Sequence, residues 1–188
     1  MKSVILVHGS YGKPYENWFP WLEGKLSKEG TRCTVPTFPS PKHQRYADWS
    51  KLLDYYLEMG YIDKETILIG HSCGSVFLAR YLLEKPELEA SCLVTVSGYN
   101  GFISGNEEMD ALNSDFYTEY PLEDIKSRVR QVHSFYSKND PFIPISYLEE
   151  FARELGGQEH VIENAGHFNS AAGLDTFPEL FDLINSIS

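Results

Sequence analysis

Short apolar segments alternate along this chain with longer stretches of helical periodicity, and this alternation limits the fold more than any other feature. The apolar segments are rich in Val and Ile and are bounded by Gly, Pro or Ser, which is typical of strands buried on both faces. Strands that alternate with helices predict a mostly parallel sheet covered on both sides. We therefore expect an α/β protein, a three-layer α/β/α sandwich with a six-stranded sheet, whose strands lie near residues 4–7, 33–38, 67–69, 92–96, 132–136 and 160–162.

The helical stretches have recognisable faces and ends. Apolar residues recur at helical spacing over 46–57 and again over 76–83, which predicts two helices that pack on the sheet. Capping-box spacing marks two further helix starts, and paired glycines mark one helix end. These signals are Ser146 with Glu149, Thr176 with Glu179, and Gly156-Gly157.

The stretch 98–121 does not follow this alternation. It is rich in Gly, Asn, Asp and aromatic residues and has no clear period. One interpretation is an excursion over the C-terminal edge of the sheet, where α/β proteins bind ligands. The other is an ordinary surface loop with a helical turn. The sequence does not decide between them, nor whether the stretch forms a lid.

Length and charge narrow the class of protein. A chain of 188 residues with 42% hydrophobic residues can build its own core, and we predict a single domain over 1–188. A net charge of −11 repels nucleic acid and anionic membranes, so we expect neither as a partner. No segment approaches the roughly 20 apolar residues of a membrane span. Three cysteines without C-x-x-C spacing indicate neither a disulfide framework nor a metal site, so we predict a cytoplasmic protein.

The strongest local signal is a G-x-S-x-G motif, Gly70-His71-Ser72-Cys73-Gly74. A strand candidate precedes it and a buried helix candidate follows it, which is the context of a nucleophile elbow. Such a turn holds the serine in a strained conformation with its hydroxyl exposed. We predict that Ser72 is a nucleophile. The alternative is a glycine-rich turn with an incidental serine.

A serine hydroxyl needs a base, and the base needs an orienting acid. After such an elbow the acid comes first in the chain and the histidine second. His167 stands in a loop directly after the last predicted strand, and we predict that it is the general base rather than a plain loop histidine. His133 and His160 lie in or beside strands and fit structural roles better. The other three histidines, His8, His43 and His71, precede the serine.

Asp140 is the predicted acid. It follows the fifth predicted strand and precedes His167 by 27 positions, which leaves room for one helix and one strand between them. Asp110 and Asp115 lie in the irregular stretch and are weaker candidates, and Asp175 comes after the histidine. The alternative for Asp140 is a turn-forming aspartate before a proline.

An oxyanion formed during acyl transfer needs two backbone N–H donors. We expect one from Cys73 and the other from the loop after the first strand, with Ser10 favoured and Tyr11 second. We expect the Cys73 side chain to point away from the substrate and to pack in the interior, with no catalytic part, although a thiol at a helix N-terminus can be reactive. No residues have metal-ligand spacing and no phosphate-binding glycine loop occurs, so we predict no metal and no cofactor.

Aromatic residues near these loops are candidates for substrate contacts. Tyr11, Trp18 and Phe19 follow the first strand, and Tyr99 and Phe168 lie in two other loops. If they wall the acyl site, they favour a small or apolar acyl group over a charged one. The alternative for each is ordinary packing between helix and sheet.

Together these segments resemble the YdeN-like serine hydrolase family, which also includes retinoblastoma-binding protein 9. The resemblance covers nearly the whole chain and implies a compact α/β-hydrolase with little or no cap. It supports the roles predicted for Ser72, Asp140 and His167 but implies no defined substrate. The retinoblastoma-binding segment L-x-C-x-E is absent, so no such partner is expected. The matching segments are Val4-Ile5-Leu6-Val7-His8-Gly9-Ser10, Glu16-Asn17-Trp18-Phe19-Pro20-Trp21-Leu22, the motif at 70–74, Ser137-Lys138-Asn139-Asp140 and Ala165-Gly166-His167-Phe168.

The predicted function is hydrolysis of small acyl esters, a carboxylesterase-like activity that proceeds through an acyl-enzyme. The predicted partner is a small-molecule acyl substrate. Two alternatives stay open: a non-catalytic binding or regulatory protein on the same scaffold, and a lyase or haloperoxidase-like use of the same residues. The sequence indicates neither the oligomeric state nor the natural substrate.

Overall fold

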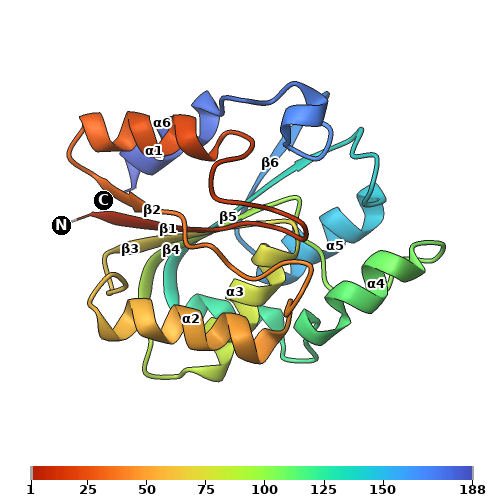
Figure 1. The fold of residues 1–188 in the computed structure, drawn as a ribbon, viewed down its shortest axis with the longest axis horizontal. Coiled ribbons are helices and arrows are strands. Elements are labelled where there is room, and N and C mark those ends of the chain that lie inside the picture. Colours follow the sequence, from red (N-terminus) through yellow and green to blue (C-terminus); the bar gives the residue numbers. More distant parts are fainter. Residues whose placement is uncertain (1, 188) are drawn as a thin grey trace.

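The computed structural model describes residues 2–187, and the strands in that range form one six-stranded sheet (Figure 1). Every strand pair is parallel, and the strand order is β2-β1-β3-β4-β5-β6. The predicted α/β architecture is therefore confirmed. The strands are β1 (Ser3–Val7), β2 (Arg32–Thr34), β3 (Thr66–His71), β4 (Ala90–Val96), β5 (Val129–Ser137) and β6 (Gln158–Ile162).

Helices cover both faces of the sheet, as predicted (Figure 1). One face carries α1 (Phe19–Lys28) and α6 (Pro178–Ser186), and the other carries α2 (Tyr46–Glu58), α3 (Cys73–Glu84) and α5 (Ile145–Leu155). Between β4 and β5 lie α4 (Glu107–Asn113) and the 3-10 turns Ser114–Phe116 and Leu122–Ser127, and the turn Ser170–Ala172 precedes α6. No helix within residues 2–187 is long and apolar enough to cross a bilayer.

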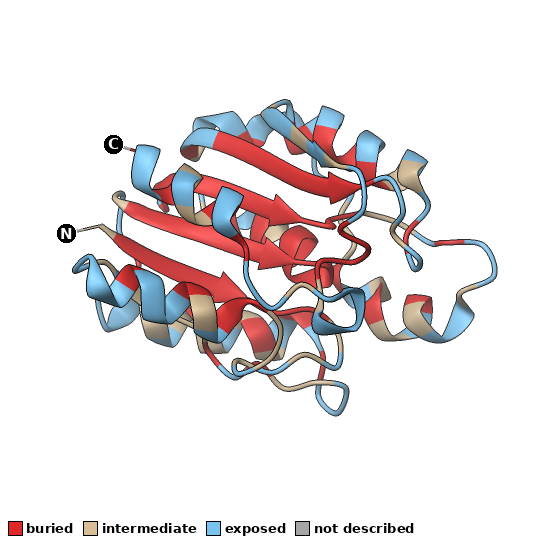
Figure 2. Ribbon diagram, turned by 90° about the horizontal axis from the view of Figure 1, so that it is seen from above, coloured by how far each residue is buried: buried red, intermediate tan, exposed pale blue. Residues whose placement is uncertain are grey.

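Alternate residues of the central strands contribute to two separate cores. Ile5 and Val7 of β1 point toward α2, α3 and α5, whereas Val4 and Leu6 point toward α1 and α6. Side chains alternate across a strand, so a strand that is apolar at every position must be covered on both sides. The buried colour of the central strands shows this directly (Figure 2).

The edge strand β2 is shorter than predicted. It covers three residues, Arg32–Thr34, although the apolar run extends over 33–38. Pro36 has no N–H to donate to β1, so pairing ends before it. Beyond the proline, the Phe38 amide donates instead to Nε2 of His8 at 3.2 Å.

Prolines, not capping boxes, mark two of the helix starts. α5 begins directly after Pro144, so Ser146 lies inside its first turn. α6 begins at Pro178, two residues after Thr176, and neither helix has a side-chain cap hydrogen bond. The fixed φ of proline suits the start of a helix, so both capping-box predictions were wrong. The predicted end of α5 is confirmed, because Gly156 adopts a left-handed φ of 65°.

Gly157 precedes β6 and faces the backbone of β5. A Cβ built on Gly157 would lie 2.2 Å from the carbonyl oxygen of Val132. Gly157→Ala should therefore lower the free energy of unfolding by about 1–3 kcal/mol, because the two strands must move apart to relieve the overlap. Urea-induced unfolding followed by circular dichroism measures this.

Gly24→Ala is the matched control. Gly24 lies inside α1, and a Cβ there would meet no atom within 4 Å. Alanine is better than glycine in a helix interior by about 0.5–1 kcal/mol, so this change should raise the free energy of unfolding. If Gly157→Ala behaved like Gly24→Ala, the close contact between β5 and β6 would be wrong.

Candidate active site

Ser72 lies at the turn between β3 and α3, in a conformation that non-glycine residues rarely adopt. Its φ is 54° and its ψ is −126°. Such a conformation costs about 1–3 kcal/mol and persists only where the surrounding structure imposes it. The Ser72 amide donates to the carbonyl of Val96 in β4 at 2.8 Å, which ties the turn to the sheet edge.

Two glycines make this turn possible, because backbone segments meet on both sides of Ser72. A Cβ on Gly74 would lie 2.5 Å from the carbonyl oxygen of Val7, and a Cβ on Gly70 would lie 2.5 Å from Cα of Ser75. Both distances exclude a side chain without movement of the backbone. The motif therefore occurs in the strand–turn–helix context that the sequence predicts.

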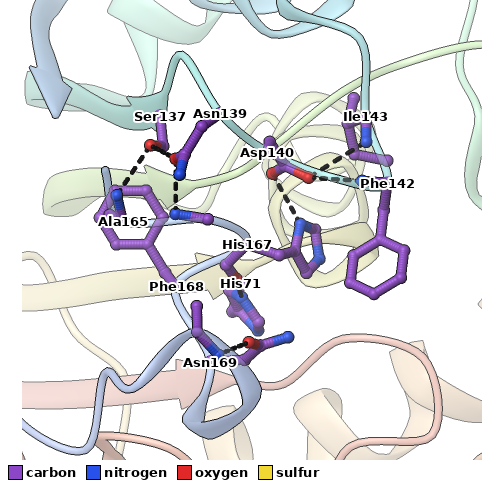
Figure 3. A network of polar contacts seen from close by, with 12 residues as sticks. His71, Ser137, Asn139, Asp140, Phe142, Ile143, Ala165, His167, Phe168 and Asn169 are labelled. Carbon is purple, nitrogen blue, oxygen red and sulfur yellow. Dashed lines mark hydrogen bonds and ion pairs between the residues drawn. The ribbon is translucent and has the colours of Figure 1, made fainter. Parts of the chain in front are cut away.

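Asp140 follows β5 and lies beside His167, which follows β6 (Figure 3). Nδ1 of His167 is 2.8 Å from Oδ2 of Asp140, and Oδ1 accepts hydrogen bonds from the amides of Phe142 and Ile143 at 2.9 and 3.1 Å. Burial raises the pKa of the Asp140 carboxyl, but the His167 hydrogen bond and these amides outweigh it, so the pKa lies below 3.8. An ionised Asp140 requires neutral His167 to carry its proton on Nδ1, which leaves Nε2 free to accept one.

The turn after β5 also holds the loop that carries His167. The hydroxyl of Ser137 accepts a hydrogen bond from the amide of Ala165 at 2.9 Å, and Oδ1 of Asn139 accepts one from the amide of Gly166 at 2.9 Å (Figure 3). One turn therefore positions both the carboxylate and the imidazole loop, and sequence reasoning did not single out these two side chains.

His71 and Trp18 hold the same loop through hydrogen bonds to two of its backbone carbonyl groups. Nε2 of His71 is 2.8 Å from the carbonyl oxygen of His167, and Nε1 of Trp18 donates to the carbonyl of Phe168 at 3.0 Å. Burial, assisted by the neighbouring His167, lowers the pKa of His71 to about 3. His71 is therefore neutral at physiological pH and donates its Nε2 proton to the loop.

Ser72 and His167 border one cavity of about 480 Å³ at the C-terminal edge of the sheet. Both are largely buried, with 6% and 9% of their surface exposed. Within residues 2–187 the Ser72 hydroxyl has no hydrogen-bond partner, so it faces the cavity unpaired. The volume lies in the range of small-molecule sites. The three side chains predicted from separate segments thus meet at one site.

The loop after β1 passes directly against Ser72. A Cβ on Gly9 would lie 2.8 Å from Cβ of Ser72, so only a glycine allows this approach. Ser10 and Tyr11 both border the cavity. The Tyr11 amide already donates to Oγ of Ser40 at 2.6 Å, so the donor ranked second for the oxyanion is engaged elsewhere.

His8 fixes the start of this loop. Its Nε2 accepts the hydrogen bond from Phe38, so its proton is on Nδ1, which lies 2.8 Å from the carbonyl oxygen of Gly9. Burial lowers the pKa of His8, although its hydrogen bonds oppose the shift. The ring is therefore a neutral support for the loop.

Cys73 is fully buried on the α3 side of the sheet. Burial raises the pKa of its thiol to about 12, so almost no thiolate exists at neutral pH. Its Sγ lies 3.3 Å from Oγ of Ser10. The thiol is a packing group, as the elbow geometry predicts, while its amide begins α3 beside Ser72.

The predicted aromatic residues divide into two groups. Tyr11 and Tyr99 border the cavity. Trp18, Phe19 and Phe168 do not border it, because all three are fully buried between the sheet and the layer of α1 and α6. The rings of Trp18 and Phe19 meet edge to face at 4.7 Å at the start of α1, whose inner side packs on the sheet. These three rings are core residues and not walls of the cavity.

The stretch 98–121 is an excursion over the site, which is the first of its two interpretations. Tyr99, Asn106 and Met109 from this stretch all border the cavity. α4 lies beyond the end of the sheet, outside the two helical layers (Figure 1). Without a regular apolar period, the sequence contains no signal for this placement.

The cavity has walls of different polarity. Met109, Phe142 and Ile143 join Tyr99 in an apolar wall, and the polar residues include Glu16 from the loop after β1. Of these five residues, the sequence predicted only Tyr99 as a candidate for substrate contacts. The five lie in three separate segments, so no local spacing could have marked them as neighbours.

These features together define an α/β-hydrolase: a parallel sheet, a strained serine at a strand–helix turn, and a carboxylate–imidazole pair at the same edge. The chain belongs to the serine hydrolase family, whose profile matches residues 4–186. The resemblance inferred from the sequence motifs is therefore confirmed.

Curated relatives and solved structures agree with this assignment. The chain is 26% identical to the putative hydrolase YdeN of Bacillus subtilis and 28% identical to the serine hydrolase RBBP9 of Rattus norvegicus, each over 98% of this chain and 95% of the relative. The crystal structure of the ydeN gene product matches with a TM-score of 0.90 and 23% identity, over 100% of this chain and 98% of that one. The Bacillus subtilis carboxylesterase CesB shares the fold, with a TM-score of 0.68 and 17% identity over 99% of this chain and 83% of that one.

The lowered pKa of Asp140 links the site to stability. A carboxyl whose pKa is lower in the folded state stabilises the fold above its unfolded pKa, and this contribution is lost as the pH falls through the folded value. Asp140→Asn should therefore lower the free energy of unfolding at pH 7, and the deficit should shrink as the pH falls below 3.8. Urea unfolding at a series of pH values measures both.

Asp182→Asn, on the exposed side of α6, is the control for this series. It should cost little stability at any pH, because an exposed carboxyl is solvated in both states. A deficit of Asp140→Asn that stayed constant from pH 7 to below pH 3.8 would contradict an ionised, paired Asp140.

Proposed function

We propose that this protein hydrolyses small carboxylic esters, with Ser72 as nucleophile, His167 as general base and Asp140 as the orienting acid. The observation that carries the proposal is the Asp140–His167 pair, whose imidazole borders the same cavity as a serine at positive φ. A serine hydroxyl becomes nucleophilic when an oriented imidazole can take its proton. Membership of the serine hydrolase family supports this reading.

The first half-reaction forms an acyl-enzyme. Nε2 of His167 takes the proton of the Ser72 hydroxyl while Oγ bonds to the ester carbonyl carbon, and the carbonyl oxygen becomes an oxyanion. The imidazolium then gives this proton to the alkoxide oxygen of the leaving group as the carbon–oxygen bond breaks. The negative Asp140 stabilises the imidazolium and keeps its ring in place.

The second half-reaction releases the acyl group. His167 takes a proton from water, whose oxygen attacks the acyl carbon. The tetrahedral intermediate collapses, Oγ of Ser72 leaves and regains the proton from His167, and the carboxylic acid departs. The site thus returns to its starting protonation state.

The proposed oxyanion donors are the amides of Ser10 and Cys73. Cys73 is the first residue of α3, and the first N–H groups of a helix are unpaired and lie at its positive end. Ser10 lies in the loop that packs on Ser72, and its neighbour Tyr11 is already engaged. Loss of one such donor typically costs about 3–4 kcal/mol of transition-state stabilisation.

The walls of the cavity support a substrate class. Tyr99, Met109 and Ile143 suit a short apolar acyl group, and the negative charge of Glu16 disfavours an anionic one. The fold shared with the carboxylesterase CesB adds support for ester substrates. We therefore propose a neutral small-molecule ester as the partner of this site.

We also propose that the activity is cytoplasmic. Cys33, Cys73 and Cys92 are all free, which suits a reducing compartment. Burial raises the pKa of each thiol to about 12. The thiols are therefore largely protonated and unreactive although they form no disulfide.

A fluorophosphonate probe tests the nucleophile. The native protein should be labelled at Ser72, as mapped by mass spectrometry, and Ser72→Ala should abolish the labelling. Ser72→Ala and His167→Ala should each lower kcat for p-nitrophenyl butyrate by about 10⁴-fold or more, because the activated serine is lost.

Ser127→Ala is the matched control, since Ser127 is an exposed serine away from the cavity. This variant should be labelled and should hydrolyse esters like the native protein. A folded native chain that takes up no probe would overturn the proposal and favour a binding protein on a hydrolase scaffold. Labelling at Ser72 without hydrolysis of any ester would favour the lyase-like alternative.

The cavity volume predicts a limit on acyl length. p-Nitrophenyl acetate and butyrate should be hydrolysed with kcat/KM at least ~10-fold above that of the palmitate ester, because a cavity of about 480 Å³ holds a short acyl group together with the leaving group but not a sixteen-carbon chain with it. Met109→Ala should move the preference toward longer chains. Met59→Ala, at a residue 57% exposed, should leave the preference unchanged. An equal rate for palmitate would contradict this size limit.

A further inference from the structure

Three polar side chains, two of them buried, connect α4 to the loop after β1. Asn113, the last residue of α4, is fully buried, and Gln44 is 5% exposed. The Ser10 hydroxyl donates to Oδ1 of Asn113 at 2.5 Å. Nε2 of Gln44 donates to both, at 2.9 Å to Oγ of Ser10 and 2.8 Å to Oδ1 of Asn113. Residues from three separate segments thus form a closed triangle of hydrogen bonds.

This triangle continues in both directions. Oε1 of Gln44 accepts from the hydroxyl of Ser40 at 2.6 Å, and that hydroxyl oxygen accepts from the amide of Tyr11 at 2.6 Å. On the other side, Nδ2 of Asn113 donates to the hydroxyl of Tyr99 at 2.8 Å. Donors and acceptors match along this whole series of hydrogen bonds. The side-chain amides of Gln44 and Asn113 therefore each use both their oxygen and their nitrogen.

α4 is itself fixed within its segment. The carboxylate of Asp110 accepts from the amide of Ile103 at 2.9 and 3.1 Å and from the hydroxyl of Tyr117 at 3.1 Å. Asp110 is 7% exposed, so these bonds lie out of water, where they are stronger. These hydrogen bonds fix the position of α4 and therefore of Asn113, its last residue.

Ser10 links this network to the proposed oxyanion site. Its Oγ lies between Oδ1 of Asn113 and Sγ of Cys73, at 2.5 and 3.3 Å. The amides of Ser10 and Cys73 are the proposed donors, so one hydroxyl joins the two residues that must point at the same oxygen atom. Asn113 and Gln44 do not border the cavity, so they can affect the reaction only through residues that they contact, and Ser10 is the cavity residue that both of them contact.

We propose that Asn113 and Gln44 are positioning residues that hold the Ser10 amide toward the oxyanion. The stretch 98–121 is then a fixed part of the site and not a lid. This inference rests on the proposed hydrolytic function. Without the Asn113 side chain, the buried amide of Gln44 and the hydroxyl of Ser10 lose an acceptor that they share, and the loop must move to find another.

Two near-isosteric variants, Asn113→Leu and Gln44→Met, test the proposal. Oxyanion donors act in the transition state, so kcat per titrated active site should fall ~10–100-fold while KM changes less than ~3-fold. Affinity for a trifluoromethyl ketone inhibitor should fall in parallel with kcat, because its bound oxyanion needs the same donors. A purely structural role would lower the melting temperature and the titratable fraction without this split.

Asn100→Leu is the matched control in the same segment. Asn100 makes two hydrogen bonds to the Thr118 backbone, at 2.8 and 2.9 Å, and none to the loop after β1. It should keep kcat per active site within ~2-fold of native, because the oxyanion donors are untouched. If Asn113→Leu does not fold, Ser10→Ala removes the same link with a smaller change and should show the same fall in kcat.

Hydrogen exchange separates failure of this inference from failure of the proposed function. Amides of residues 9–12 should exchange faster in Asn113→Leu and at the native rate in Asn100→Leu. Unchanged exchange and unchanged kcat in a chain that is labelled at Ser72 would overturn the positioning role alone. A native chain that neither labels nor hydrolyses would overturn the proposed function and any catalytic role of Asn113, and exchange would then report only whether Asn113 holds the loop.

Discussion

The close approach of α3 to the end of β1 is the constraint on which the site depends. Gly74 lies against the Val7 carbonyl at a distance that no side chain allows, and the chain at Ser72 must take a positive φ to reach it. The turn therefore points the Ser72 hydroxyl out of the C-terminal edge of the sheet. Because the described strands are all parallel, the loops that follow β1, β5 and β6 begin at that same edge (Figure 1).

Burial keeps two histidine rings near Ser72 neutral, whereas hydrogen bonds keep the buried carboxylate of Asp140 ionised. Burial lowers the pKa of His8 and His71, and both rings serve as neutral supports for neighbouring loops. Asp140 is also buried, but the hydrogen bonds that its carboxylate accepts outweigh the cost of burying the charge and keep it ionised. The imidazole of His167 therefore borders the cavity with an ionised carboxylate behind it, which is the electrostatic arrangement that proton transfer from a serine requires.

Much of the fold and the central residues of the site could be predicted from the sequence, because their signals are local. Apolar runs marked all six strands, and only β2 was too long, since Pro36 removes a ladder donor that hydropathy does not register. The G-x-S-x-G spacing marked the turn at Ser72, and position after a strand marked Asp140 and His167. The capping boxes failed because prolines beside them start the helices.

By itself the sequence determined the strand–helix alternation, the family and the three side chains of the candidate active site. Only the tertiary structure decided that Trp18 and Phe168 face the core, and that Gln44 and Asn113 meet behind Ser10. The physical reason is the distance along the chain between the residues that form each feature. A strand, a turn or an elbow is set by residues a few positions apart, whereas a buried polar network joins residues tens of positions apart and exists only once the sheet has brought their loops together.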